Sequence, residues 1–138
     1  MGWHDTSIHA ITFAPEQHEF ILDLDYIFAW VEPEAPSPGY SFWISPATLV
    51  FKDVRNFSAN LGDPLGPLIM HVAREEQTGS DSLEWSWTMD LLHGKVTFSA
   101  SGYIQYTRKL PIKCQSQELS LAERGGISFD RPSTLLVQ

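Results

Sequence analysis

Apolar and polar residues alternate over several stretches of the chain, and this period of two predicts β-strands. Between Glu19 and Val31 one face is apolar, and its side chains are Phe20, Leu22, Leu24, Tyr26, Phe28 and Trp30. The opposite face holds Glu19, Asp23 and Asp25 together with Ile21 and Ile27. Residues 83–91 alternate as clearly, with Leu83, Trp85, Trp87, Met89 and Leu91 on the apolar side. Both segments are therefore expected to be half-buried strands.

Further strands are predicted over residues 3–13, 40–44, 48–57, 68–72 and 95–109. Loops rich in proline and glycine separate them at residues 33–39 and 60–67, and His93-Gly94 favours a hairpin turn. No segment has an apolar period of 3.6 over the ten or more residues that a helix needs. We predict a mainly β fold, an antiparallel β-sandwich or partly closed barrel of about seven strands with at most one short helix.

Some segments leave alternatives open. Residues 3–13 alternate imperfectly, because Ile11 and Phe13 lie on one parity and Ile8 and Ala10 on the other. Ser45-Pro46-Ala47 interrupts an apolar run, so residues 40–57 form one bent strand or two. Gly102 marks a bulge or a close approach. Leu119 and Leu121 suit either a short strand or a helical turn. We expect a single β domain over residues 1–131 and a C-terminal tail over 132–138.

The charge narrows the classes of partner. Nine Lys and Arg against seventeen Asp and Glu give a net charge of −8, and no segment concentrates basic residues. Nucleic acid and anionic membranes are therefore not expected partners, whereas a basic protein surface or a cation fits this charge; excess acidity is also a common solubility feature. The single cysteine, Cys114, allows no intramolecular disulfide, and no stretch reaches the roughly 20 apolar residues of a membrane span. We expect a cytoplasmic protein; the sequence gives no oligomeric state.

Several short motifs along the chain form a recognisable set. They are Trp3-His4-Asp5 with Ile8-His9-Ala10-Ile11, residues 22–27 (LDLDYI) with Trp30, residues 46–51 (PATLVF), residues 101–105 (SGYIQ) with Ser116-Gln117, and residues 123–127 (ERGGI). In these the chain resembles a family of small uncharacterised bacterial proteins. The resemblance covers nearly the whole chain. It implies a bacterial origin and a self-contained domain, and it adds no catalytic residue.

The His4-Asp5 pair also occurs in metal-dependent phosphohydrolases built as helical bundles, but here it lies in a strand pattern without helices. A local metal site would use Asp5 and His9, which we place on one strand face, with Asp23 or Asp25. Residues four apart on a strand lie about 13 Å apart, which is too far to share one ion without a bend. A His–Asp hydrogen bond between strands is therefore favoured, and we predict no metal and no cofactor.

Asp23 and Asp25 are about 7 Å apart along their strand, a spacing that suits paired acid and base chemistry on a sugar. We favour a solvent-facing edge instead, because Glu19 shares their face. If Ile21 and Ile27 bring partial cover, the carboxylates need partners, for which Arg55, Arg108 and Arg124 are the candidates. Arg124-Gly125-Gly126 is too short for a phosphate loop, although Arg124 is a candidate for reading an anion.

Three functions follow as hypotheses. The leading one is a non-enzymatic protein-binding domain, for example an immunity-like protein that neutralises a basic toxin. No Gly-x-Ser-x-Gly motif or other nucleophile motif supports a catalytic triad. The rival is a small metal-dependent or acid-base enzyme that uses His4, Asp5, His9, Asp23 and Asp25. The third is a carrier of an apolar small molecule in a cavity lined by Trp30, Trp43, Trp85 and Trp87.

Overall fold

The computed structural model of the protein describes residues 2–34, 36, 39–62, 67–77 and 84–132. Nine strands and two short helices are present in these ranges. The strands are β1 (Thr6–Ala14), β2 (Glu19–Val31), β3 (Ser41–Lys52), β4 (Arg55–Asn60), β5 (Leu68–Glu76), β6 (Trp85–Leu91), β7 (Lys95–Ala100), β8 (Gly102–Thr107) and β9 (Ile112–Cys114). The helices are the 3₁₀ turn η1 (Pro15–Gln17) and the single α-helical turn α1 (Leu121–Arg124).

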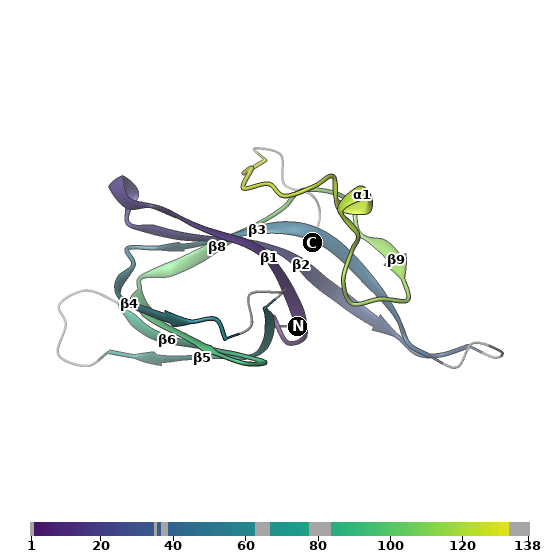
Figure 1. Ribbon diagram of the computed structural model, residues 1–138, viewed down its shortest axis with the longest axis horizontal. Coiled ribbons are helices and arrows are strands. Elements are labelled where there is room, and N and C mark those ends of the chain that lie inside the picture. Colours follow the sequence, from purple (N-terminus) through teal and green to yellow (C-terminus); the bar gives the residue numbers. More distant parts are fainter. Residues whose placement is uncertain (1, 35, 37–38, 63–66, 78–83, 133–138) are drawn as a thin grey trace.

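All paired strands are antiparallel and form one sheet in the order β4-β7-β6-β5-β1-β2-β3-β8, with β9 also on β3. The start of β1 pairs with β5, whereas the rest of β1 pairs with β2. The sheet bends at β1, so that β5, β6, β7 and β4 lie beneath β1, β2, β3 and β8 (Figure 1). The prediction of a mainly β, antiparallel fold with at most one short α-helix is confirmed; the described strands form one sheet that is not closed, and they number nine rather than about seven. Residues 95–109 form two strands, divided at Ser101.

The main core fills the space between the two halves of the bent sheet. It combines Leu22, Leu24, Leu49 and Phe51 from one half with Trp87, Met89 and Phe98 from the other. The apolar face predicted for β2 thus packs inward as far as Tyr26, which is partly buried against this core. Burial of such side chains stabilises the fold by roughly 1.5–3 kcal/mol each, which makes this core its main support.

Two bulges reverse the facing of side chains along β1 and β2. In β1, Ile8 pairs with Leu24 but Ala10 pairs with Asp23, so His9 is the extra residue. This explains why the alternation of residues 3–13 is imperfect. In β2 the register shifts between Ile27 and Ala29. The predicted inward position of Trp30 is therefore wrong: it packs on Phe42, outside the main core, and its exposed fraction is 42%.

The strand β3 is continuous through Pro46, but residues 40–57 still contain two strands, because β3 ends at Lys52 and β4 begins at Arg55. The strand β3 pairs with β8 from Ala47 to Lys52 and with β9 from Phe42 to Ile44, so Pro46 lies between these two partner strands. The carbonyl of Pro46 accepts a hydrogen bond from Arg108 N on that side. The nitrogen of Pro46 points into the same gap between β8 and β9, where the sheet needs no backbone N–H donor.

The C-terminal segment, which we define as residues 115–132, crosses the outer face of β2 and β3 (Figure 1). Leu119 is buried there with Ile27, Phe42 and Ile44 in a second, small core. The alternative at Leu119 and Leu121 is resolved as a helical turn, α1. Of the predicted tail, residues 133–138 lie outside the described ranges.

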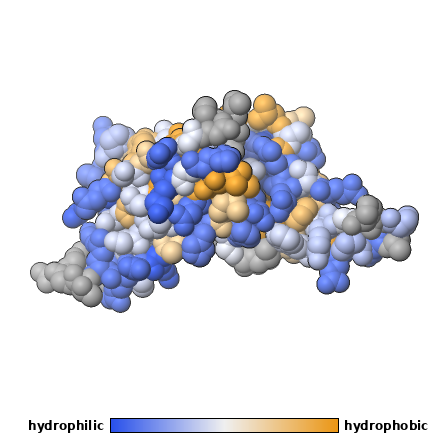
Figure 2. All heavy atoms as spheres, turned by 60° about the horizontal axis from the view of Figure 1, so that its bottom comes forward, coloured by the Kyte–Doolittle hydropathy of each residue, from blue (hydrophilic) through white to orange (hydrophobic). Residues whose placement is uncertain are grey.

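No helix in the part of the chain that the structure describes is long and apolar enough to cross a membrane. The face shown in Figure 2 is largely hydrophilic, and its hydrophobic residues form separate groups. At one end of the molecule the β2–β3 hairpin projects past the body of the sheet (Figure 1).

Candidate functional site

Asp23 and Asp25 lie on the outer face of β2, opposite Thr48 and Pro46 of β3. Both have an exposed fraction of 0%. The predicted solvent-facing edge is therefore wrong, because the C-terminal segment covers this face. Coverage by a segment whose only regular element is the short turn α1 leaves no periodic pattern in the sequence, so alternation alone does not predict it.

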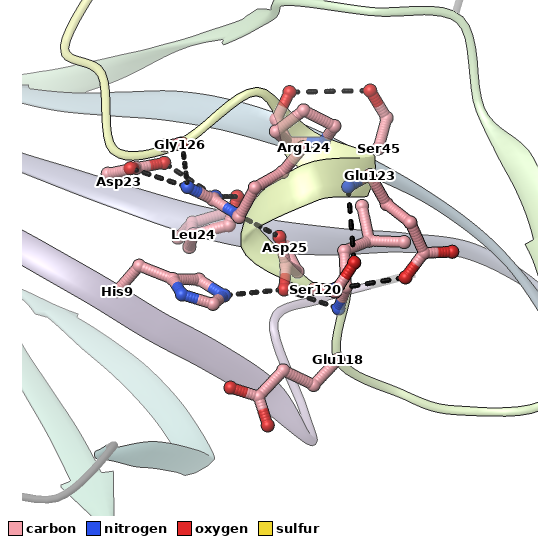
Figure 3. A network of polar contacts seen from close by, with 12 residues as sticks. His9, Asp23, Leu24, Asp25, Ser45, Glu118, Ser120, Glu123, Arg124 and Gly126 are labelled. Atoms are coloured by element: carbon pink, nitrogen blue, oxygen red, sulfur yellow. Dashed lines mark hydrogen bonds and ion pairs between the residues drawn. The ribbon is translucent and has the colours of Figure 1, made fainter.

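The carboxylate of Asp23 accepts hydrogen bonds from four donor atoms, and Figure 3 shows those from Arg124. Arg108 Nη2 donates to Oδ1 over 2.6 Å, and Arg124 Nη2 donates to the same oxygen over 2.7 Å. Oδ2 accepts from Arg124 Nη1 over 2.8 Å and from the backbone N–H of Ser128 over 3.0 Å. Arg124 thus binds both oxygens in the bidentate geometry in which guanidinium–carboxylate hydrogen bonds are strongest.

Arg124 is held at this point by the turn α1. Ser120 and Glu123 cap the turn reciprocally, and Gly125 ends it with a φ of 80°. The side chain of Arg124 has no exposed surface. Besides Asp23, it donates to Asp25 Oδ1 over 3.1 Å and to the carbonyl of Gly126 over 2.8 Å. The sequence made Arg124 a candidate for binding an external anion. In the structure the anions that it binds are the carboxylates of Asp23 and Asp25.

Asp25 links β1 to the C-terminal segment. Its Oδ2 accepts from His9 Nε2 over 2.6 Å and from the backbone N–H of Leu119 over 2.9 Å (Figure 3). His9 follows the inward-facing Ile8 and therefore lies on the outer face of the sheet, where Asp25 also lies. The predicted His–Asp hydrogen bond between strands is therefore confirmed for His9 and Asp25.

The charges in this cluster balance, since the two carboxylates face the guanidinium groups of Arg108 and Arg124. Burial alone raises the pKa of Asp23, but hydrogen bonds from Arg124, Arg108 and Ser128 N lower it by more, so the pKa lies below 3.8. For Arg124, burial lowers the pKa, but the hydrogen bond to Asp23 and the charges of Asp25 and Asp23 raise it by more, so the pKa lies above its ordinary value. Both groups therefore stay charged across the physiological range.

The cluster holds the C-terminal segment against the sheet. Two further hydrogen bonds hold the segment to the sheet: Thr48 Oγ1 donates to Asp130 O over 2.6 Å, and Arg131 Nη2 donates to Glu19 Oε1 over 2.6 Å. Sequence reasoning named Arg108 and Arg124 as partners correctly. Its third candidate, Arg55, instead lies 3.6 Å from Glu84. The role of Arg131 was missed, because a residue beside the expected tail carried no signal.

The residues of the hypothetical metal site do not all gather: His9 contacts Asp25, but Asp5 does not join them. Asp5 precedes β1 with a φ of 64°, so it shares no strand face with His9. It lies beside His4 and Gln117, 3.4 Å from His4 Nε2. Within the described ranges, no group of three or more His, Cys, Asp and Glu side chains is arranged to hold a metal ion.

The four tryptophans of the hypothetical carrier cavity are dispersed. Trp87 is buried in the main core, and Trp85 packs at its edge. Trp30 and Trp43 instead lie near the projecting end of the β2–β3 hairpin, where their exposed fractions are 42% and 41%. Tyr40, 48% exposed, has its ring 5.8 Å from that of Trp30. The exposed acidic residues Glu32 and Glu34 follow β2 at the same end.

Beyond Leu24, β2 pairs with β3 on one side, and the described residues place no paired strand on its other side. We call the exposed aromatic residues Trp30, Tyr40 and Trp43 the hairpin aromatics; Trp30 and Tyr40 share one face of the hairpin, and Trp43, which pairs with Ala29, lies on the other face. They combine large apolar rings with nearby negative charge.

Comparisons of the chain with protein-family models, with curated proteins and with solved structures gave no match.

Proposed function

We propose that the chain is a non-enzymatic protein-binding domain and that the hairpin aromatics are the centre of its binding surface. The observation that carries this proposal is the exposure of Trp30, Tyr40 and Trp43 at one projecting end of the molecule. Tryptophan and tyrosine dominate the energetics of protein interfaces, because each buries a large rigid area at small cost in side-chain entropy.

The partner in this proposal is a basic protein surface. Glu32 and Glu34 lie beside the aromatic residues, and the whole chain carries a net charge of −8. Complementary charge speeds association and disfavours acidic competitors. An immunity-like role, in which the domain neutralises a basic toxin in a bacterial cytoplasm, is the concrete form that we favour.

The buried carboxylates support a binding role over acid-base catalysis. Asp23 and Asp25 have no exposed surface, and their oxygens accept seven hydrogen bonds from protein donors. A general acid or base must come within hydrogen-bond reach of its substrate, and the C-terminal segment occupies that space.

The test is co-expression with the products of neighbouring genes, followed by titration calorimetry of any complex. We expect a basic partner to bind, and we expect Trp30→Ser and Trp43→Ser each to weaken binding by about thirtyfold, as hot-spot truncations of about 2 kcal/mol do. The matched control is Leu92→Ser, because Leu92 is 53% exposed at the distant β6–β7 turn. The proposal fails if no neighbouring product binds, or if Leu92→Ser weakens binding as much as the tryptophan variants.

A further inference from the structure

A concave surface lies at the end of the molecule opposite to the hairpin aromatics. The β1–β2 turn and the β3–β4 turn meet there, joined by a 2.8 Å hydrogen bond from Val54 N to His18 O. Between them is an open depression of about 570 Å³. Its walls include Phe13, His18, Val54, Arg55, Asn56 and Phe57. This volume is within the range of small-molecule sites.

The backbone departs from regular strand geometry at this depression. Of the four non-glycine residues with positive φ in the described part of the chain, three are here: His18 at 55°, Asp53 at 54° and Asn56 at 52°. Such conformations are uncommon and cost free energy, so their concentration at one place is a reason to look for a function.

The consequence of this geometry is an unusual grouping of neighbouring side chains. Arg55, Asn56 and Phe57 are consecutive, yet all three line the depression. Strict alternation would send Asn56 to the opposite face of β4. The left-handed conformation of Asn56 and the register shift between Arg55 and Ser58 turn the three side chains to the same side.

The depression has an apolar wall of aromatic rings. Phe13 is 47% exposed, and its ring meets that of Phe57 edge-on at a centroid distance of 4.8 Å. Phe57 in turn packs on Phe20 of the main core, with 4.8 Å between the ring centroids. Core packing therefore fixes this wall, which presents a firm surface to a flat apolar ligand.

The polar rim favours an anionic group on that ligand. The guanidinium of Arg55 is largely exposed, and its ion pair with Glu84 is long, at 3.6 Å. The carboxylate of Glu19, also in the wall, is already bound by Arg131 over 2.6 and 3.3 Å. Asp53, next to the wall, is bound by the hydroxyl of Ser101. His18 and Asn56 add hydrogen-bonding groups to the guanidinium, the side chain best shaped to bind a carboxylate.

We propose that this depression binds a small planar aromatic carboxylate, with the ring against Phe13 and Phe57 and the carboxylate at Arg55 and Asn56. The site lies apart from the hairpin aromatics and does not depend on the protein-binding function proposed above.

The test is titration of the full chain with 1-naphthoate, followed by backbone amide chemical shifts. We expect the shifts to concentrate on residues 13–19 and 53–57. Arg55→Gln should weaken binding about tenfold, the equivalent of one charge-assisted hydrogen bond. Asn56→Gly, which keeps the left-handed backbone but removes the amide, should also weaken binding. Lys113→Gln, on β9 at the other end of the molecule, is the matched control and should leave it unchanged.

Three results would overturn the proposal. One is the absence of localised shifts up to the solubility limit of 1-naphthoate. Another is equal weakening by Arg55→Gln and Lys113→Gln. The third is binding of the neutral analogue 1-naphthalenemethanol as tightly as the carboxylate, which would remove the anionic class. Because Asn56→Gly suits the existing backbone, misfolding of an Arg55 variant would still leave the proposal testable.

Discussion

Arg124 binds both carboxylate oxygens of Asp23, over 2.7 and 2.8 Å, and neither side chain has any exposed surface. The pair joins a helical turn near the end of the chain to the middle of β2, 101 residues earlier. In the low-dielectric interior such a pair is costly to break, because the remaining partner keeps its charge without compensation.

Arg124→Met should therefore destabilise the fold by about 3–5 kcal/mol, measured as the free energy of unfolding in urea. The substitution leaves Asp23 with Arg108 and Ser128 N only, and it removes a donor from Asp25. The matched control is Arg55→Gln, because Arg55 is 68% exposed and only 3.6 Å from Glu84. That change should cost about 1 kcal/mol or less. Equal effects of the two substitutions would contradict a structural role for the cluster.

The free energy of unfolding should fall in acid because of the lowered pKa of Asp23 in this cluster. The folded state holds the pKa of Asp23 below its ordinary value of 3.8. As the pH falls, Asp23 therefore becomes protonated in the unfolded chain before it becomes protonated in the folded protein. The contribution of Asp23 is then complete above pH 3.8 and is lost as the pH falls through the folded-state pKa. Carboxyl carbon NMR should give Asp23 a pKa below 3.8, and Arg124→Met should raise it. An unchanged titration of Asp23 in that variant would contradict this explanation.

The sequence was sufficient for the features that follow from alternation alone. Phe20, Leu22 and Leu24 face the core as the period of two predicts, and 85–91 forms the expected half-buried strand. Composition also made arginine the natural partner for buried carboxylates, which led to Arg108 and Arg124. These inferences succeed because the underlying rules act between near neighbours or depend on charge only.

The other features of the fold and the site depend on β-bulges and on tertiary packing, which a period of two does not encode. A bulge at His9 and another between Ile27 and Ala29 each reverse the facing of all later residues in their strand. Hence Ile8 and Ile11 both pack on the core despite opposite parity, and Trp30 leaves it. The cover over Asp23 comes from a segment about 100 residues away, and only tertiary packing brings the two together.

His9 should stabilise one end of the C-terminal segment more than the other. Its bond to Asp25 supports the oxygen that also accepts from Leu119 N, whereas Ser128 N binds Asp23. His9→Ala should therefore speed hydrogen exchange at the Leu119 amide by about tenfold or more, and at the Ser128 amide by less. His71→Ala, at an exposed position of β5, is the control and should change neither. Equal acceleration at Leu119 and Ser128 would indicate that the segment opens as one unit.

Two glycines, Gly94 in the β6–β7 turn and Gly102 at the start of β8, allow a final test of the packing. A Cβ on Gly94 would lie 1.9 Å from the backbone oxygen of Asn60, so Gly94→Ala must displace β4 where Asn60 pairs with Lys95. We expect a loss of about 1–3 kcal/mol in thermal or urea unfolding, as for other overpacked sites. The sequence suggested a bulge or a close approach at Gly102, yet a Cβ there would meet nothing within 4 Å. Gly102→Ala should change stability by about 0.5 kcal/mol or less, and a larger loss than for Gly94→Ala would contradict this packing.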